Sequence, residues 1–210
     1  MTQATWRDAS GAVLADFDVS RETSHRIERI IETLDEWRGR INLIGPGEWS
    51  HVWPRHVADS LQLLDHIPRG ARIMDFGSGA GFPGLIIAAD RCPESHVMLV
   101  ESVGKKCAYL RSAAAAAGLP VRVVQARVES LAPEPAQIVT ARAVAALPRL
   151  LDLSAPWLEK GGIALFPKGR TWQEELTRAK QSWNFTCEAI VSRTHPEGAI
   201  LKISEVQRHG

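Results

Sequence analysis

The chain has 210 residues, of which 45% are hydrophobic and 23% are charged, and its formal net charge is +1. This composition is typical of a globular protein, and the length is sufficient for one α/β domain with a full core. No segment approaches the roughly 18 consecutive apolar residues that a membrane span needs. The N-terminus lacks the basic start and apolar stretch of a secretion signal, so we expect a cytoplasmic protein that does not enter membranes.

The cysteines argue against two kinds of stabilising chemistry. Cys92, Cys107 and Cys187 are odd in number and lie far apart in the chain. No Cys-x-x-Cys pair or cluster of cysteine and histidine suggests a zinc site, so we expect neither a disulfide framework nor a metal. Because the net charge is close to zero, contact with a polyanion must come from a local basic patch.

The N-terminal third has helical patterns. Residues 1–17 show no clear period, and we expect them to be partly mobile. From Ser20, a predicted N-cap, to Ile41, apolar residues recur at spacings of three and four, which predicts a helix. After a break at residues 45–47, a second helix is expected to begin near Pro54. We therefore predict a helical extension at residues 1–68, followed by one compact domain at residues 69–210.

Short apolar runs alternate with helical patterns through the rest of the chain. Helices of this length between strands indicate right-handed crossovers and a largely parallel sheet. The last two runs flank a turn at residues 195–198 and predict an antiparallel hairpin. The predicted strands are 72–76, 97–101, 121–125, 138–141, 163–166, 186–191 and 199–205, and the predicted helices are 83–89, 105–117, 147–158 and 172–183.

The most informative segment is the glycine-rich loop at residues 75–84, which directly follows a predicted strand and precedes a predicted helix. Glycines let the chain turn sharply and let a ligand approach the backbone. In an open α/β sheet this loop lies at the carboxyl ends of the strands, where ligands bind. Gly79, Gly81 and Gly84 also satisfy the Gly-x-Gly-x-x-Gly pattern of dinucleotide-binding proteins, so a nicotinamide-dependent oxidoreductase is an alternative.

Two features favour S-adenosylmethionine over a nicotinamide cofactor. Asp75 ends the first strand, where its carboxylate is expected to face a cationic ligand and to repel a pyrophosphate. The glycines then begin two residues after Asp75, as in the Asp-x-Gly-x-Gly-x-Gly loops of methyltransferases. Glu101 ends the second strand, where an acid can bind ribose hydroxyls, but both cofactors use this feature.

Several motifs follow one another in order between about residues 25 and 170. They are Asn-Leu-Ile at 42–44, Arg-His-Val-Ala-Asp-Ser-Leu at 55–61, Gly-Ser-Gly-Ala-Gly-Phe-Pro-Gly at 77–84, Glu-Ser-Val-Gly-Lys-Lys at 101–106, Arg-Val-Glu at 127–129 and Ala-Arg-Ala at 141–143. Together these motifs resemble the GidB (RsmG) family. The resemblance implies a class I, Rossmann-like S-adenosylmethionine-dependent methyltransferase with a mostly parallel seven-stranded sheet and a helical N-terminal extension. It also implies methylation of guanine N7 in 16S ribosomal RNA of the small ribosomal subunit.

The resemblance also implies roles for individual residues. It puts the glycine loop against the cofactor, Glu101 on the ribose, and Val128 and Glu129 beside the adenine. Arg142 would lie beside the methionine end of the cofactor and the incoming base, and is the predicted catalytic residue. The predicted cofactor-binding residues are Asp75, Gly77, Ser78, Gly79, Gly81, Phe82, Glu101, Val128, Glu129 and Arg142, and the predicted RNA contacts are Arg55, His56, Lys105, Lys106 and Lys168.

The predicted RNA contacts have structural alternatives. Arg55, His56 and Asp59 have the spacing of one solvated helix face with an internal ion pair. Lys105 and Lys106 open a predicted helix, where a cation is mildly unfavourable to the helix dipole, and this favours a phosphate-binding role.

Three residues depart from the pattern expected of the family. Pro54 stands where we expect a helix-compatible residue, so the second helix is expected to start later or to kink. Trp49 and Trp53 add aromatic bulk nearby, and either they are structural or they stack on RNA bases.

The chemistry implied by the resemblance suits this sequence. Guanine N7 has a lone pair and no proton to lose, so methylation needs no general base and no nucleophilic side chain. The enzyme has mainly to hold donor and acceptor in line, which can contribute roughly 7–11 kcal/mol. If Arg142 does not act on substrate, the alternative is an ion pair with Glu101 or Glu129. A further alternative is a non-catalytic ribosome-assembly factor of the same fold, and in either case we expect a monomer.

Overall fold

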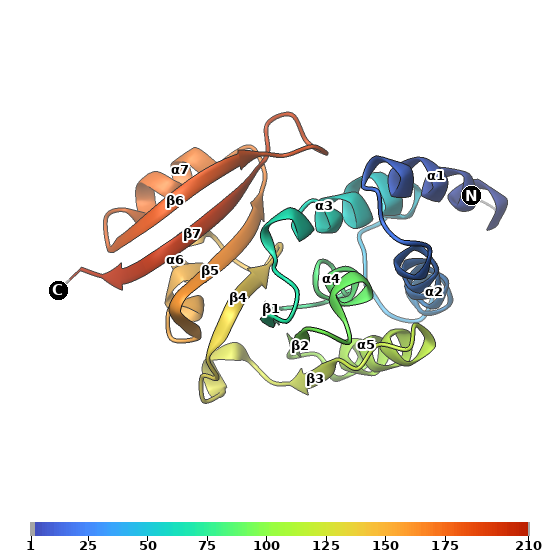
Figure 1. Cartoon of the computed structure of the whole chain (residues 1–210), viewed down its shortest axis with the longest axis horizontal. Coiled ribbons are helices and arrows are strands. Elements are labelled where there is room, and N and C mark those ends of the chain that lie inside the picture. Colours follow the sequence, from blue (N-terminus) through green and yellow to red (C-terminus); the bar gives the residue numbers. More distant parts are fainter. Residues whose placement is uncertain (1–2, 210) are drawn as a thin grey trace.

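The computed structural model describes residues 3–209, whose strands form a seven-stranded sheet in the order β3-β2-β1-β4-β5-β7-β6 (Figure 1). Neighbouring strands from β1 to β5 pair in parallel, and β7 is antiparallel to both β5 and β6. The predicted mostly parallel sheet with an antiparallel hairpin is thereby confirmed. The strands are β1 (Arg72–Phe76), β2 (His96–Glu101), β3 (Arg122–Gln125), β4 (Ala136–Ala141), β5 (Leu158–Lys168), β6 (Trp183–Val191) and β7 (Ala199–Arg208).

Helices cover both faces of the sheet (Figure 1). On one face, α2, α4 and α5 share a core with Ile73 and Leu99. On the other face, α6 and α7 share a second core with Met74 and Phe76. Neighbouring residues of β1 therefore enter opposite cores, because side chains alternate across a strand. The helices are α2 (Arg21–Arg38), α4 (Gly84–Arg91), α5 (Gly104–Ala116), α6 (Leu147–Ser154) and α7 (Trp172–Ala179).

A helix at the N-terminus, α1 (Gln3–Asp16), occupies most of the segment in which the sequence shows no clear period. Residues 1 and 2 lie outside the described residues. The apolar residues near the end of α1 are only partly buried, which explains why the segment shows no apolar period. Its end is held by the guanidinium of Arg193, which donates to the Asp16 carbonyl at 2.9 Å and lies 4.1 Å from the ring centre of Phe17.

The next two helical segments follow the sequence prediction with one change. Ser20 caps α2, and its hydroxyl accepts a hydrogen bond from the Thr23 amide at 3.0 Å. The segment around Pro54 is a turn of π-helix, which fits the inability of proline to continue an α-helical ladder. The helical segments between α2 and the sheet are η1 (Glu48–His51), η2 (Val52–Val57), α3 (Ala58–Leu61) and η3 (Leu64–His66).

The two tryptophans beside Pro54 are part of the core. Trp49 is 9% exposed and lies under the guanidinium of Arg38, while Trp53 is 1% exposed. Neither ring presents a face on which an RNA base could stack. Trp53 and Ile27 from the N-terminal helices belong to the same core as the sheet, so the division between residues 1–68 and 69–210 stays a prediction. None of the helices within residues 3–209 is both long and apolar enough to cross a membrane.

Candidate active site

The glycine loop turns at the carboxyl end of β1, as the sequence predicts. Gly77, Gly79 and Gly81 all have positive φ, a backbone region that side chains with a Cβ rarely adopt. At Gly77, where φ is +62°, a Cβ would also lie 2.6 Å from a methyl carbon of Val144. The amide of Ser78 donates to the Val100 carbonyl of β2 at 3.1 Å, which ties the loop to the neighbouring strand. The loop therefore has a fixed shape that only glycine can maintain.

Glu101 lies beside this loop at the end of β2 and is 6% exposed. One carboxylate oxygen accepts from the Gly79 amide at 3.0 Å, and the other accepts from the Val103 amide at 2.8 Å. These bonds hold the carboxylate at the carboxyl edge of the sheet. An acid at this position can bind the two hydroxyls of a ribose, and this role of Glu101 stays a prediction.

Gly77 of the loop and Glu101 line a cavity of about 310 Å³. Val128 and Glu129, on the 3-10 turn η4 (Val128–Ser130), form another wall, and Glu129 pairs with the exposed guanidinium of Arg149. The volume lies at the lower end of the range for small-molecule sites, roughly 300–1,000 Å³. Glycine backbone, an acid for the ribose and an apolar side chain for the adenine are the groups that S-adenosylmethionine requires, so the residues present fit this cofactor.

Asp75 does not face this cavity, which corrects the expectation drawn from its place in the sequence. The side chain is fully buried, and it accepts a hydrogen bond from the Thr140 hydroxyl of β4 at 2.8 Å. Burial raises the pKa of Asp75 to about 6, although hydrogen bonds from Ser78, Thr140 and Gly84 oppose the shift. The carboxylate lies beneath the glycine loop, and its cofactor-binding role stays a prediction. Ser78 is likewise buried and donates to the Asp75 carbonyl.

Arg142 follows β4 and is held by residues of the N-terminal helices. Its Nη1 lies 3.3 Å from a carboxylate oxygen of Asp59, and its Nη2 lies 2.7 Å from Nδ1 of His56. The guanidinium carbon lies 5.5 Å from the ring centre of Phe82 in the glycine loop. Neither Glu101 nor Glu129 forms the ion pair that was left open for this arginine. Ala143, the next residue, has a φ of +56°, a strained conformation that often marks a functional site.

His56 is uncharged in this environment. Burial and the neighbouring guanidinium groups of Arg142 and Arg55 lower the pKa of His56 to about 3. Its ring stacks on Phe82 with the ring centres 5.2 Å apart. A neutral imidazole can accept at one nitrogen only, so Nδ1 accepts from Arg142 and Nε2 carries the hydrogen toward Glu48.

A second cavity of about 640 Å³ adjoins the first. Arg142, His56 and Asp59 lie in its wall, and Val144 and Ala145 line both cavities. The segment after β4 therefore separates a site that fits a nucleoside cofactor from a cleft large enough for a nucleobase.

Comparison with known proteins identifies the family. The family model described as rRNA small subunit methyltransferase G (GidB) matches residues 23–199. A relative of that name from Hyphomonas neptunium is 59% identical over 202 residues, which cover 96% of this chain and 97% of the relative. Another from Gluconobacter oxydans is 46% identical, covering 90% of this chain and 97% of the relative. The chain belongs to the rRNA small subunit methyltransferase G family. This membership excludes the nicotinamide-dependent oxidoreductase.

Solved structures agree on the fold. TYW2 from M. jannaschii in complex with AdoMet superposes with a TM-score of 0.59 at 14% identity, covering 81% of this chain and 80% of that one. The ribosomal protein L11 methylase of Lactobacillus delbrueckii gives a TM-score of 0.58 at 13% identity, with coverages of 71% and 78%. At such low identity the likeness concerns the fold alone, which is that of class I S-adenosylmethionine-dependent methyltransferases.

The predicted RNA contacts of this family member differ in their surroundings. Arg55 is exposed at the rim of the second cavity and pairs with Glu48 at 3.0 Å. Lys105 is exposed and Lys106 half-buried at the start of α5. Lys168 is bound on both sides, because its ammonium donates to the Ala145 carbonyl and to Glu175, each at 2.8 Å. With only 10% of its side chain exposed, Lys168 holds the segment after β4 and does not present a free cation.

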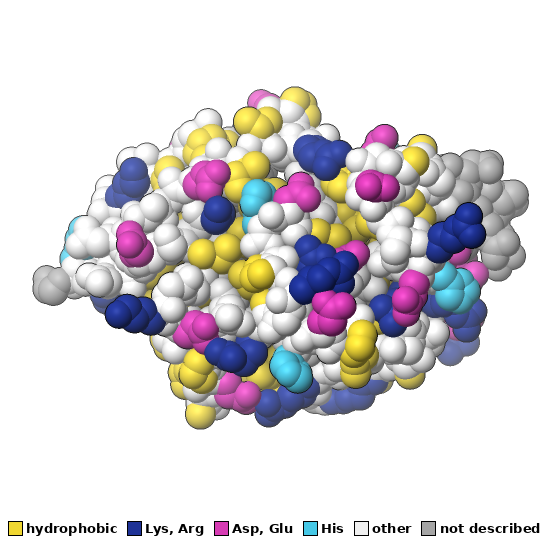
Figure 2. All heavy atoms as spheres, viewed as in Figure 1, with side chains coloured by type: hydrophobic (Ala, Val, Ile, Leu, Met, Phe, Trp, Pro, Cys, Tyr) yellow, Lys and Arg dark blue, Asp and Glu magenta, His cyan; other side chains and the backbone are white. Residues whose placement is uncertain are grey.

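The protein surface is mixed in charge. Figure 2 shows basic and acidic side chains interspersed over one face, in agreement with the net charge of +1. Among residues 3–209 no group of His, Cys, Asp and Glu side chains has an arrangement that could hold a metal ion.

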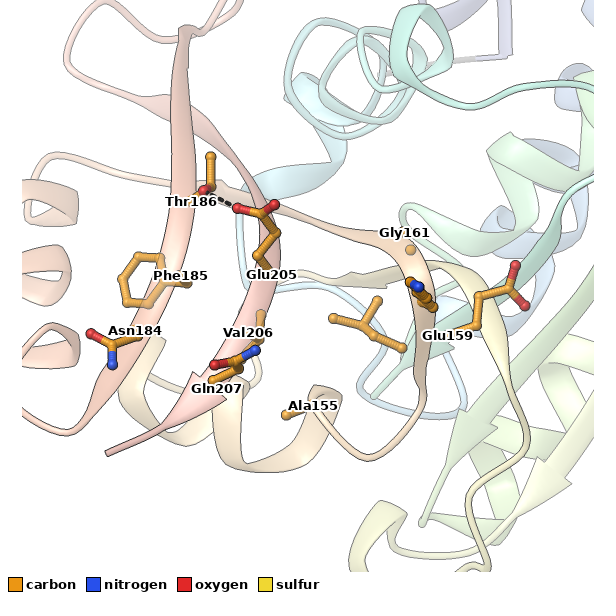
Figure 3. A pocket seen from close by; sticks show the side chains of 12 residues that line it. Ala155, Glu159, Gly161, Asn184, Phe185, Thr186, Glu205, Val206 and Gln207 are labelled. Carbon is orange, nitrogen blue, oxygen red and sulfur yellow. Dashed lines mark hydrogen bonds between the residues drawn. The ribbon is translucent and has the colours of Figure 1, made fainter. Parts of the chain in front are cut away.

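A further cavity lies away from the glycine loop and Arg142. It measures about 1070 Å³ and opens between β5, β6 and the end of β7 (Figure 3). Its walls include the first residues of β5, whereas the active site lies at the carboxyl ends of the parallel strands. In its wall the hydroxyl of Thr186 donates to Glu205 at 2.6 Å, so these polar groups are already paired with each other.

Proposed function

We propose that the chain transfers the methyl group of S-adenosylmethionine to N7 of a guanine in 16S ribosomal RNA. The observation that carries this proposal is the pair of adjoining cavities that share Val144 and Ala145. One is bounded by the glycine loop and Glu101, and the other by Arg142. A methyl donor and an acceptor base in these two cavities would meet at the segment after β4.

In this proposal the residues of the first cavity bind the cofactor. Glu101 binds the ribose hydroxyls, and Val128 and Glu129 lie beside the adenine. The backbone of the loop, with Gly77, Gly79 and Gly81, follows the contour of the cofactor, while Ser78 and Asp75 support the loop from within. Phe82 closes the end of the loop that faces Arg142.

The proposed reaction needs orientation more than acid–base chemistry. When bound, the cofactor supplies a methyl group on a positively charged sulfur. The lone pair of guanine N7 forms the new bond to carbon, the sulfur keeps the electrons of the broken bond, and no proton moves. Arg142 has unused N–H donors that suit the O6 oxygen next to N7, and such a contact would fix the base. Correct placement of the two reactants can contribute roughly 7–11 kcal/mol.

The RNA is held from outside the cleft. Arg55, Lys105 and Lys106 are the proposed phosphate contacts, since each is at least partly exposed near one of the two cavities or the end of β2. We propose that the chain acts as a monomer in the cytoplasm and that it uses no metal, because the reaction requires neither a Lewis acid nor a base.

The test is transfer of radiolabelled methyl to small ribosomal subunits that lack this modification, followed by nucleoside mass spectrometry. Label in 7-methylguanosine of 16S RNA is the expected result. An Arg142→Ala variant should bind S-adenosylhomocysteine but transfer methyl far more slowly, at a rate that single-turnover assays can still measure, whereas Arg122→Ala, at an exposed pair with Glu134, should remain active. Cofactor binding without label in any RNA would favour a non-catalytic assembly factor, and no cofactor binding would refute the proposal.

A further inference from the structure

The guanidinium of Arg142 is the meeting point of three distant parts of the chain. It belongs to the segment after β4, but its two partners, His56 and Asp59, belong to η2 and α3 of the N-terminal extension. Its side chain is 18% exposed and that of Asp59 is 24% exposed. The N-terminal helices therefore do more than cover the sheet, because they supply the partners of the arginine in the substrate cleft.

Asp59 is itself held in place from the other side. Its second carboxylate oxygen accepts from the hydroxyl of Thr194 and, at 3.3 Å, from the side-chain amide of Gln62. Gln62 in turn accepts from the backbone amide of Arg193 at 3.0 Å. The turn between β6 and β7 is thus connected to Arg142 through Asp59. Because the Asp59 carboxylate has several hydrogen-bond partners, its position is fixed. A fixed carboxylate in turn favours a fixed position for the Arg142 guanidinium.

His56 holds the arginine from the side of the cofactor loop. Its ring stacks on Phe82, and its Nδ1 accepts from Arg142 at 2.7 Å. A protonated imidazole could not accept this bond, so the interaction requires the neutral ring that burial maintains. Phe82 of the cofactor loop therefore contacts His56, and His56 in turn contacts Arg142, the side chain proposed to face the acceptor base.

Charge gives Asp59 a second effect. The proposed methyl transfer moves positive charge from sulfur onto the guanine ring, and an unpaired guanidinium near that ring would oppose it. Asp59 at 3.3 Å offsets the charge of Arg142, and this effect is larger in a partly buried cleft than in water.

We propose that Asp59 and His56 are positioning residues that hold Arg142 at the acceptor base, so that the N-terminal extension completes the active site. This inference rests on the proposed function. His56 is then assigned to Arg142 and not to the RNA. Neither residue touches the reacting atoms, and each acts through the arginine.

Kinetics of matched variants test the proposal. Asp59→Asn keeps the size of the side chain but removes its charge. His56→Asn keeps an acceptor close to the position of Nδ1, whereas His56→Leu removes it. We expect kcat to fall roughly 10- to 100-fold for Asp59→Asn and His56→Leu, because displacement by about 1 Å can cost that much. His56→Asn should recover part of this loss, and S-adenosylhomocysteine affinity should stay close to that of the wild type.

A double-mutant cycle with Arg142→Ala separates positioning from general structural support. If Asp59 acts through the arginine, Asp59→Asn should reduce kcat no further in the Arg142→Ala background. Asp35→Asn serves as a control, since this carboxylate belongs to the N-terminal helices and pairs with Arg38 and not with Arg142. Additive losses, or losses that follow Tm, would overturn the proposal.

A spectroscopic measurement gives a readout that does not depend on turnover. The ¹⁵N shifts of His56 in the full-length protein should show an unprotonated Nδ1 that accepts a hydrogen bond, and this signal should move in Arg142→Ala. A protonated Nδ1 would overturn the proposal. Absence of methyl transfer by the wild-type chain would instead contradict the proposed function and this inference together, whereas an active wild type with additive variants contradicts the inference alone.

Discussion

Replacement of Gly84 by alanine tests how tightly the glycine loop is built against the sheet. A Cβ at this position would lie 2.4 Å from Cδ2 of Leu99 and 2.6 Å from a carboxylate oxygen of Asp75. Carbon atoms in contact prefer about 3.5–4.0 Å, so the neighbours would have to move by roughly 1 Å. Leu99 and Asp75 are both fully buried on adjacent strands, and Thr140 holds the carboxylate, so neither can move away easily.

Overpacking of this kind costs about 1–3 kcal/mol. For a chain of this size, we expect Gly84→Ala to lower Tm by roughly 2–10 °C and to weaken S-adenosylhomocysteine binding, because Asp75 supports the loop. Circular dichroism melting and calorimetric titration measure the two effects. Gly11→Ala is the control, since nothing lies within 4 Å of its Cβ in α1, and alanine there should be stabilising by up to about 1 kcal/mol. If Gly84→Ala melts at or above the wild-type temperature while Gly11→Ala behaves as expected, the packing argument fails.

Three further changes test the other parts of the site. Glu101→Gln should weaken S-adenosylhomocysteine binding roughly 10- to 100-fold in calorimetric titration, because it loses a charged hydrogen bond of about 1.5–3 kcal/mol to the ribose. Unchanged affinity would show that Glu101 does not bind the ribose. The pKa of Asp75 is raised to about 6 in the folded chain, so its favourable contribution to stability is present below about pH 4 and is lost as the pH rises through 6. Asp75→Asn should therefore gain stability relative to wild type, by up to about 3 kcal/mol, between pH 4 and 7 in urea unfolding, and a pH-independent difference would contradict this cause. Lys168→Met leaves Glu175 buried without its cation and should lower the free energy of unfolding by about 3–5 kcal/mol in the same assay. Lys202→Met, in the more exposed pair with Glu188, is the control, and equal losses of stability for both variants would show that burial of the Lys168–Glu175 pair is unimportant.

The sheet was predictable because its parallel strands are buried on both faces. Such strands appear as short continuous apolar runs, and the loops between them contain the glycines and helix starts that mark their ends. Helix α1 was not predictable in this way. Only part of its apolar surface meets the core, and Arg193, far along the chain, holds its end. A segment that depends on distant contacts shows no period of its own.

Within the site, the glycine loop and Glu101 were predictable from local order, because a strand end fixes which side of the sheet they occupy. The direction of Asp75 was not, since the same strand end also allows a carboxylate to point inward, where Thr140 of the neighbouring strand receives it. Arg142 shows the same limit more clearly. The alternative to a substrate role was an ion pair with Glu101 or Glu129, which share its edge of the sheet, yet its partner Asp59 comes from a helix 83 residues earlier. The spacing of Arg55, His56 and Asp59 is equally compatible with a solvated helix face. Only the packing of that helix over the end of β4 turns the pattern into an internal contact, so the function of these residues follows from the fold and not from their spacing.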